Sequence, residues 1–106
     1  MVMATDKLNK AKQLVYLSAT KSVQLSANTG KQVNFTRSDF TGLLDSDNIV
    51  FGIASAGDST SVYQNLFLSY GMNSGTGTSS SNAVIARIVS SSAATYNGTA
   101  RILVER

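Results

Sequence analysis

SVQLSANTGKQVNFT, residues 22–36, is the stretch that decides the fold class of this chain. Apolar residues alternate with polar ones in both of its halves, at Val23, Leu25, Val33 and Phe35. A period of two is typical of strands that bury one face and leave the other in water. The residues between the two halves, Ala27-Asn28-Thr29-Gly30, are favoured in tight turns. The stretch therefore predicts two strands joined as a β-hairpin.

Similar strand-like runs lie on both sides of this hairpin. They are LVYLS (14–18), NIVFGIA (48–54), SVYQNLFLSY (61–70), AVIARIVS (83–90) and TARILVER (99–106). Together with the two halves of the hairpin they make about seven strands, and no run has the pattern of a long helix. The sequence therefore predicts the all-β class, as an antiparallel β-sandwich or jelly roll with a short N-terminal arm.

Three local features refine this prediction. NIVFGIA is apolar on both faces, which indicates a central strand, and its Gly52 indicates a bulge or the close approach of a neighbour. Asn97-Gly98 is a strong turn pair and predicts a turn before the last strand. That strand has two distinct faces, Ile102 with Val104 and Arg101 with Leu103 and Glu105.

Length and charge indicate one domain with a basic start. The chain has 106 residues, enough for one hydrophobic core and too few for two. We expect an N-terminal arm and first strand in residues 1–21 and the sandwich domain in residues 22–106. Residues 1–31 hold five lysines against one aspartate, and the rest holds four arginines against five acidic residues. We interpret the basic start as a docking arm or as a solvated chain end, with Lys7, Lys10, Lys12 and Lys21 as its cations.

Several residue types that carry chemistry are missing. The chain has no histidine and no cysteine, which removes the commonest general base, the thiol nucleophile and the usual zinc ligands. Gly75-Thr76-Gly77 lacks the third glycine and the following helix of a dinucleotide loop. Asp45-Ser46-Asp47-Asn48 has the spacing of calcium ligands, but Val50 and Ala56 stand where an EF-hand needs glycine and glutamate. We interpret it as a turn, and we expect neither an enzyme nor a metal or cofactor site.

Two polar connections are candidates for contact with a partner. NSGTGTSSSN (73–82) has no apolar side chain, and we interpret the loop 71–82 as a flexible surface loop at one end of the sandwich. The connection 37–48 would also face solvent or a partner, while its apolar residues Phe40, Leu43 and Leu44 fold back over the core. Its acidic residues are expected to be solvated.

Aromatic and cationic residues in the second half of the chain form a candidate interface or ligand patch. Its members are Tyr63, Phe67, Tyr70, Arg87 and Tyr96. Such side chains stack on sugar or base rings. The alternative is that the tyrosine rings pack into the core and leave their hydroxyl groups at the rim.

The order of elements over residues 22–106 resembles the small β-sandwich modules of tailed bacteriophage virions. The elements that carry this resemblance are, in order, the strand NIVFGIA, the tyrosine-containing strand SVYQNLFLSYG, a polar loop, the strand NAVIARIVSSS that ends in serines, an aromatic residue before Asn-Gly, and a last strand. The resemblance is one of rhythm and composition and carries over no site residue. It implies a non-enzymatic virion structural protein, made in the host cytoplasm and self-associating on the capsid or tail surface as a cement, decoration or tail accessory protein.

The partners implied by this resemblance are copies of the same chain, as a trimer or dimer, and other virion proteins. A symmetric interface would bury apolar residues that the single chain leaves exposed, from among Val50, Tyr63, Phe67, Ile85 and Val89. The alternative function is a receptor- or glycan-binding module of a phage tail fibre. A nucleic-acid-binding barrel is a third interpretation, and the sparse positive charge makes it the least favoured of the three. We expect no membrane insertion, because no apolar run approaches the length of a membrane-spanning helix.

Overall fold

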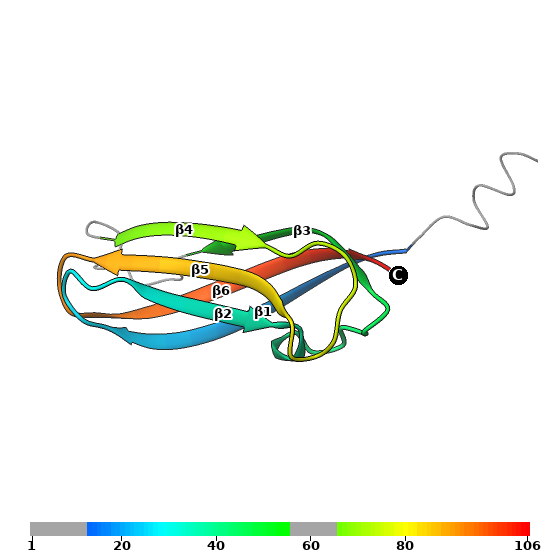
Figure 1. The fold of residues 1–106 in the computed structure, drawn as a ribbon, viewed down its shortest axis with the longest axis horizontal. Coiled ribbons are helices and arrows are strands. Elements are labelled where there is room, and N and C mark those ends of the chain that lie inside the picture. The colour runs from blue at the N-terminus through cyan, green and yellow to red at the C-terminus, as the bar shows by residue number, and fades with distance from the viewer. Residues whose placement is uncertain (1–12, 56–65) are drawn as a thin grey trace, which may run out of the picture.

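The computed structural model describes residues 13–55 and 66–106, which form two packed three-stranded sheets (Figure 1). The strands are β1 (Leu14–Leu25), β2 (Lys31–Thr36), β3 (Asn48–Ser55), β4 (Leu66–Met72), β5 (Asn82–Ser90) and β6 (Ala94–Glu105). Sheet A has the order β1-β6-β3, sheet B has the order β2-β5-β4, and all neighbours are antiparallel. The predicted all-β antiparallel sandwich is confirmed, with six strands in the described part of the chain.

The chain alternates between the sheets at nearly every step. Consecutive strands lie in different sheets except for β4 and β5, which are neighbours in sheet B. The strand β1 continues through the boundary expected between residues 21 and 22, and it joins the two predicted runs 14–18 and 22–26 into one strand. In the described ranges 13–55 and 66–106 the structure has no helix with the length and apolarity to cross a bilayer.

The predicted hairpin at residues 22–36 is wrong. The strands β1 and β2 belong to different sheets, so the turn between them carries the chain across the sandwich. Asn28 supports this turn with a positive φ of 57°, and its backbone N–H donates to the carbonyl of Ser90 over 2.7 Å. The alternation itself is confirmed, because Leu25, Val33 and Phe35 are all buried. A period of two reports which face is buried and not which strand is the neighbour.

The predicted turn at Asn97-Gly98 is also wrong. Both residues lie inside β6, where Asn97 pairs with Ser22 and Gly98 pairs with Lys21 of β1. Pairing along the whole length of β1 therefore outweighs the local turn preference of the Asn-Gly pair. The two faces expected for the end of this strand are confirmed, since Ile102 and Val104 are buried on the inner side.

NIVFGIA forms an edge strand and not the central strand that its composition indicates. Among the six described strands β3 pairs with β6 alone, apart from an isolated bridge between Ile49 and Gly75. Val50 is 39% and Phe51 is 56% exposed. The close approach of a neighbour expected at Gly52 is confirmed, whereas the irregularity of this strand lies at Val50 and Gly52 pairs regularly with Ile102. The register shifts between Ile49 and Phe51, as in a β-bulge, and a Cβ atom on Gly52 would lie only 3.1 Å from the Cγ2 atom of Val84 in sheet B.

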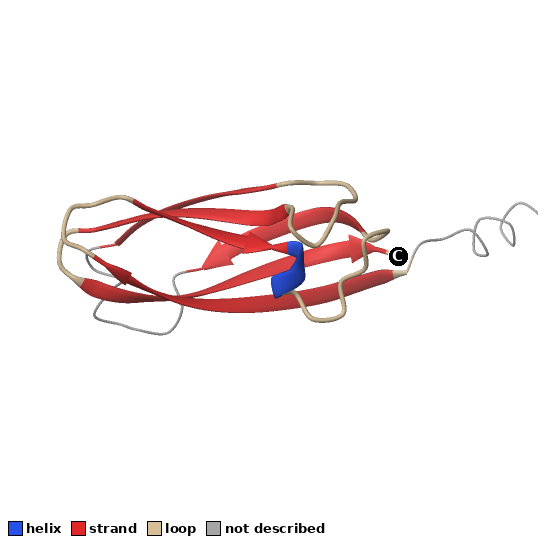
Figure 2. Ribbon diagram, turned by 60° about the horizontal axis from the view of Figure 1, so that its bottom comes forward, coloured by secondary structure: helices blue, strands red, loops and turns tan. Residues whose placement is uncertain are grey.

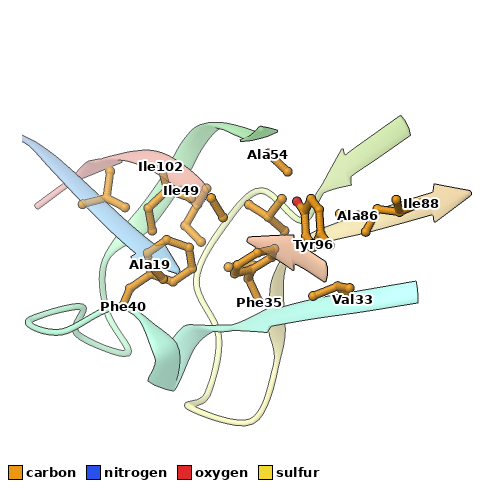
Figure 3. Packing of buried hydrophobic residues seen from close by; sticks show 14 of the residues in the cluster. Ala19, Val33, Phe35, Phe40, Ile49, Ala54, Ala86, Ile88, Tyr96 and Ile102 are labelled. Atoms are coloured by element: carbon orange, nitrogen blue, oxygen red, sulfur yellow. The ribbon is translucent and has the colours of Figure 1, made fainter. Parts of the chain in front are cut away.

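The hydrophobic core lies between the two sheets (Figure 3). Sheet B contributes Phe35 and Ile88, and sheet A contributes Tyr96 and Ile102, all at 1% exposure or less. Phe40, from the connection between β2 and β3, covers one end of this core at 2% exposure. Burial of apolar surface at about 25 cal/mol per Å² is the main term that holds the two sheets together.

Candidate functional site

Of the four cations of the proposed docking arm, Lys21 lies within the described residues. Lys7, Lys10 and Lys12 lie outside the described residues. Lys21 lies in β1, where its ammonium group is 3.0 Å from Oδ2 of Asp39 and donates to the carbonyl oxygen of Asn34 over 2.8 Å. Asn34 belongs to β2 of the other sheet, so Lys21 links the edges of the two sheets. Burial alone would raise the pKa of Asp39, but the hydrogen bonds from Lys21 and from the Thr36 backbone outweigh it and lower this pKa.

The predicted aromatic patch is divided between the two sheets. Phe67 is 74% exposed and pairs with Val89 across β4 and β5, and Arg87 is exposed on the same outer face of sheet B. Tyr70, at the edge strand β4, is 50% exposed. Tyr63 lies outside the described residues. Tyr96 belongs to sheet A and is fully buried, as the core interpretation of the tyrosines expects.

Arg37 organises the loops at one end of the sandwich, the end that carries the C-terminus (Figure 2). It opens a short 3-10 turn, Arg37–Asp39, and its side chain is only 4% exposed. Nη2 donates to the carbonyl oxygens of Leu44 over 2.7 Å and Asp47 over 2.9 Å. Nη1 donates to the carbonyl of Gly75 over 3.3 Å, so one guanidinium group ties the two long loops together. The sequence gives no signal for this role beyond a cation in a long connection.

Asp47 is the second buried charge of this end. Its carboxylate accepts hydrogen bonds from Nε and Nη2 of Arg106 at 3.1 and 2.8 Å and from the backbone N–H of Leu44 at 2.9 Å. The hydrogen bonds from Arg106 and Leu44, with the positive charges of Arg106 and Arg37, lower the pKa of Asp47 against the opposing effect of burial. The expectation of a solvated acid is wrong here, because the side chain fixes the loop from within.

The polar loop after β4 is attached to its neighbour by main-chain hydrogen bonds. Gly75 and Ile49 exchange two N–H to C=O bonds of 3.0 Å, and Arg37 and Ser38 donate to the carbonyls of Ser81 and Ser79 over 2.8 and 3.0 Å. A loop without apolar side chains can therefore keep a defined path, because its backbone groups are paired. These hydrogen bonds hold the polar loop against the connection 37–48 and the start of β3.

The apolar residues of the connection 37–48 divide between core and surface. Phe40 is buried and Leu43 is half-buried against the core, as expected. Leu44 is 50% exposed, so its predicted burial is wrong. Its backbone N–H and carbonyl are held by Asp47 and Arg37, which fixes the main chain and leaves the side chain outside.

Two hollows lie on the outer face of sheet A, the face that points away from sheet B. A polar groove of about 470 Å³ runs over its middle and is lined by Thr20, Lys21, Ser22, Ser55, Asn97, Gly98, Thr99 and Arg101. Hydroxyl, amide and cationic groups dominate this lining. Such groups can donate and accept hydrogen bonds, and no carboxylate is among the residues that line the groove.

The end of the same face where β1 begins and β6 ends is apolar. We call it the apolar face, made of Leu14, Tyr16, Phe51, Ile53 and Leu103. Tyr16, Leu103 and Phe51 form one row across the three strands, because Tyr16 and Phe51 both pair with Leu103. Tyr16 is 60% exposed and Leu14 is 61% exposed. A hollow of about 200 Å³ lies within this face.

Sequence reasoning missed the apolar face as a unit. Its residues come from three segments, and only the register of β1 and β3 against β6 brings them into one row. Within residues 13–55 and 66–106 no three acidic side chains gather as a metal site would require. Comparison with protein-family models, with curated proteins and with solved structures found no match for this chain.

Proposed function

We propose that this chain is a non-enzymatic virion structural protein of a tailed bacteriophage, which self-associates on the capsid or tail surface. The observation that carries the proposal is the apolar face. Tyr16 and Phe51 stay more than half exposed on either side of Leu103, although the sandwich already has a closed core between its sheets. Contiguous exposed apolar surface of this kind marks contact with another macromolecule.

The architecture is compatible with such a role. The core is formed between the sheets, so the outer faces can meet partners without reorganising the fold. The loops at one end are held by Arg37 and Asp47 and present a defined surface. A pre-organised module loses little conformational entropy on assembly, which favours attachment in many copies.

The composition of purified particles tests this proposal. Phage particles from a culture that carries the gene would be purified by density-gradient centrifugation and measured by quantitative mass spectrometry. We expect the chain in a fixed ratio to a major capsid or tail protein. Abundant chain in the lysate with none in the particles would contradict the proposal.

A second candidate is recognition of a host glycan, and the polar groove favours it. Thr20, Asn97 and Thr99 line a groove of about 470 Å³ together with Arg101, and these groups can pair with sugar hydroxyls. The test is a glycan array with the wild-type chain and with Asn97→Ala. Reproducible binding that this substitution weakens at least tenfold would favour recognition. Binding that Asn97→Ala leaves unchanged, or no binding at all, would remove the groove from consideration.

A further inference from the structure

We propose that a second copy of this chain docks on the apolar face in an antiparallel arrangement, with a two-fold axis at the level of Leu103. The inference rests on the self-association in the proposed function and names the surface and the symmetry that produce it. The main evidence for this arrangement is the order of three outward-facing residues on β6, the central strand of sheet A.

These three residues are Arg101, Leu103 and Glu105 of β6. They alternate with the buried Ile102 and Val104, so all three project from the outer face of sheet A. A positive charge and a negative charge therefore stand at equal distances along the strand on either side of Leu103. Leu103 itself lies at the centre of the apolar row that Tyr16 and Phe51 complete.

A two-fold axis in the plane of the interface, perpendicular to β6, makes this pattern complementary to itself. It reverses the strand direction, so β6 of one copy runs antiparallel over β6 of the other. Leu103 then faces its own counterpart, and Arg101 of each copy faces Glu105 of the other. An axis parallel to the strands would instead oppose like charges, which costs interaction energy. The antiparallel arrangement is an isologous interface, in which the same patch serves both copies.

Within residues 13–55 and 66–106 the salt bridges are Lys21 with Asp39 and Arg106 with Asp47, and neither Arg101 nor Glu105 takes part in these two. Toward the described residues, Nη1 of Arg101 donates one long hydrogen bond of 3.4 Å to Oγ of Ser55. Covering the face with an uncharged surface would desolvate both groups without compensation, whereas a second copy supplies an opposite charge to each.

The rest of the face has the layout of a protein interface. Tyr16, Phe51 and Leu103 form an apolar centre, and the charged residues lie on either side of it along β6. Aromatic residues at the centre and charged residues toward the rim are the usual composition. The hollow of about 200 Å³ beside Leu103 gives a side chain of the second copy room to enter.

Charge reversal tests both the surface and the orientation. The dimer dissociation constant would be measured by sedimentation equilibrium for the wild-type chain, for Arg101→Glu, for Glu105→Arg and for the double variant R101E/E105R. Each single reversal creates two like-charged pairs across the axis and should raise the dissociation constant roughly 30-fold or more. The double variant restores opposite charges and should return to within about threefold of the wild-type value.

Arg87→Glu is the matched control, because Arg87 is exposed on the outer face of sheet B. It should leave the dissociation constant unchanged, and circular dichroism of every variant should match the wild type. If neither single reversal changes the dissociation constant, the proposed surface is wrong, although the chain still self-associates. Single reversals that weaken the dimer without rescue by the double variant would overturn the antiparallel orientation. A wild-type chain that stays monomeric would overturn the proposed function together with this inference.

Discussion

The aromatic ring of Tyr96 lies over Gly98 on the inner side of β6, in the space that a Cβ atom at position 98 would need. The two residues are two positions apart on one strand and therefore point to the same face. The phenol hydroxyl reaches past Gly98 and donates to the carbonyl oxygen of Ser55 over 2.8 Å, at the end of β3. A glycine inside a paired strand is normally unfavourable, and here the ring that covers it compensates.

Gly98→Ala should destabilise the fold by about 2 kcal/mol, because the added methyl group displaces the Tyr96 ring from a packed core. Urea unfolding followed by circular dichroism measures the effect. Gly71→Ala is the control, since Gly71 also lies within a paired strand and a Cβ atom there meets no atom within 4 Å. Equal unfolding midpoints for the two variants would show that Tyr96 does not depend on the glycine.

Tyr96→Phe should lower the free energy of unfolding by about 1 kcal/mol at neutral pH, because it removes the hydrogen bond to Ser55. Burial raises the pKa of Tyr96 above its usual 10.0. The folded state therefore holds the phenol proton more tightly than the unfolded state, so stability is full below pH 10.0 and falls as the pH rises through the folded-state pKa.

Unfolding at about pH 8 and about pH 11 separates these two effects of Tyr96. The wild-type chain should lose more stability over this interval than Tyr96→Phe does. Tyr70→Phe, at an exposed position on the edge strand β4 of sheet B, is the control and should behave as the wild type at both values. If Tyr96→Phe and the wild type lose the same amount of stability over this interval, groups other than Tyr96 cause the alkaline destabilisation.

Asp47→Asn should cost about 2 kcal/mol at neutral pH, because the paired hydrogen bonds from Arg106 lose their charged acceptor. The folded-state pKa of Asp47 is lowered below 3.8, so its contribution to stability is full above that pH and is lost as the pH falls through the folded-state pKa. The variant should lose less stability than the wild type on acidification. Some dependence should remain, because the pKa of Asp39 is lowered as well.

The measurement for Asp47 is urea unfolding at neutral pH and at about pH 2 to 3. Asp45→Asn is the control, because Asp45 is exposed and belongs to the same turn. It should change the stability by less than about 0.5 kcal/mol at either pH. A loss for Asp45→Asn equal to that for Asp47→Asn would mean that the turn depends on general negative charge and not on the buried carboxylate.

Arg37→Met should destabilise the fold by about 3 kcal/mol, because the carbonyl groups of Leu44, Asp47 and Gly75 lose a charged donor. Hydrogen exchange measured by NMR should be faster than in the wild type at Ser38, whose amide donates to Ser79, and at Gly75, whose amide donates to Ile49 of β3. Arg87→Met is the control and should change stability by less than about 0.5 kcal/mol. Unchanged protection of both loop amides in Arg37→Met would contradict the role of this guanidinium group.

Local pattern predicts the class of the fold and the buried face of each strand, and it does not predict strand neighbours. The alternation at Val33 and Phe35 identifies an amphipathic strand correctly, but the same alternation suits a hairpin and a strand that crosses to the other sheet. Composition misplaced β3 for a related reason. Apolar residues on both sides of β3 indicate that both sides are buried. In the structure the outer side of this edge strand is exposed and belongs to the apolar face.

The candidate site could be predicted only in part. The outward order of Arg101, Leu103 and Glu105 follows from the sequence, because period two is a local property. The row that Leu103 forms with Tyr16 and Phe51 depends on pairing between distant segments, which no local pattern reports. The sequence allows Tyr96 to lie in a surface patch or in the core, and the Gly98 beneath it leaves the space in which its ring turns inward.

The central claim is that this chain associates with itself through the apolar face. Its most direct test is the solution mass of the wild-type chain by light scattering across a dilution series. We expect a mass that rises with concentration toward twice the 11.2 kDa of one chain. A mass of 11.2 kDa at every concentration would contradict it.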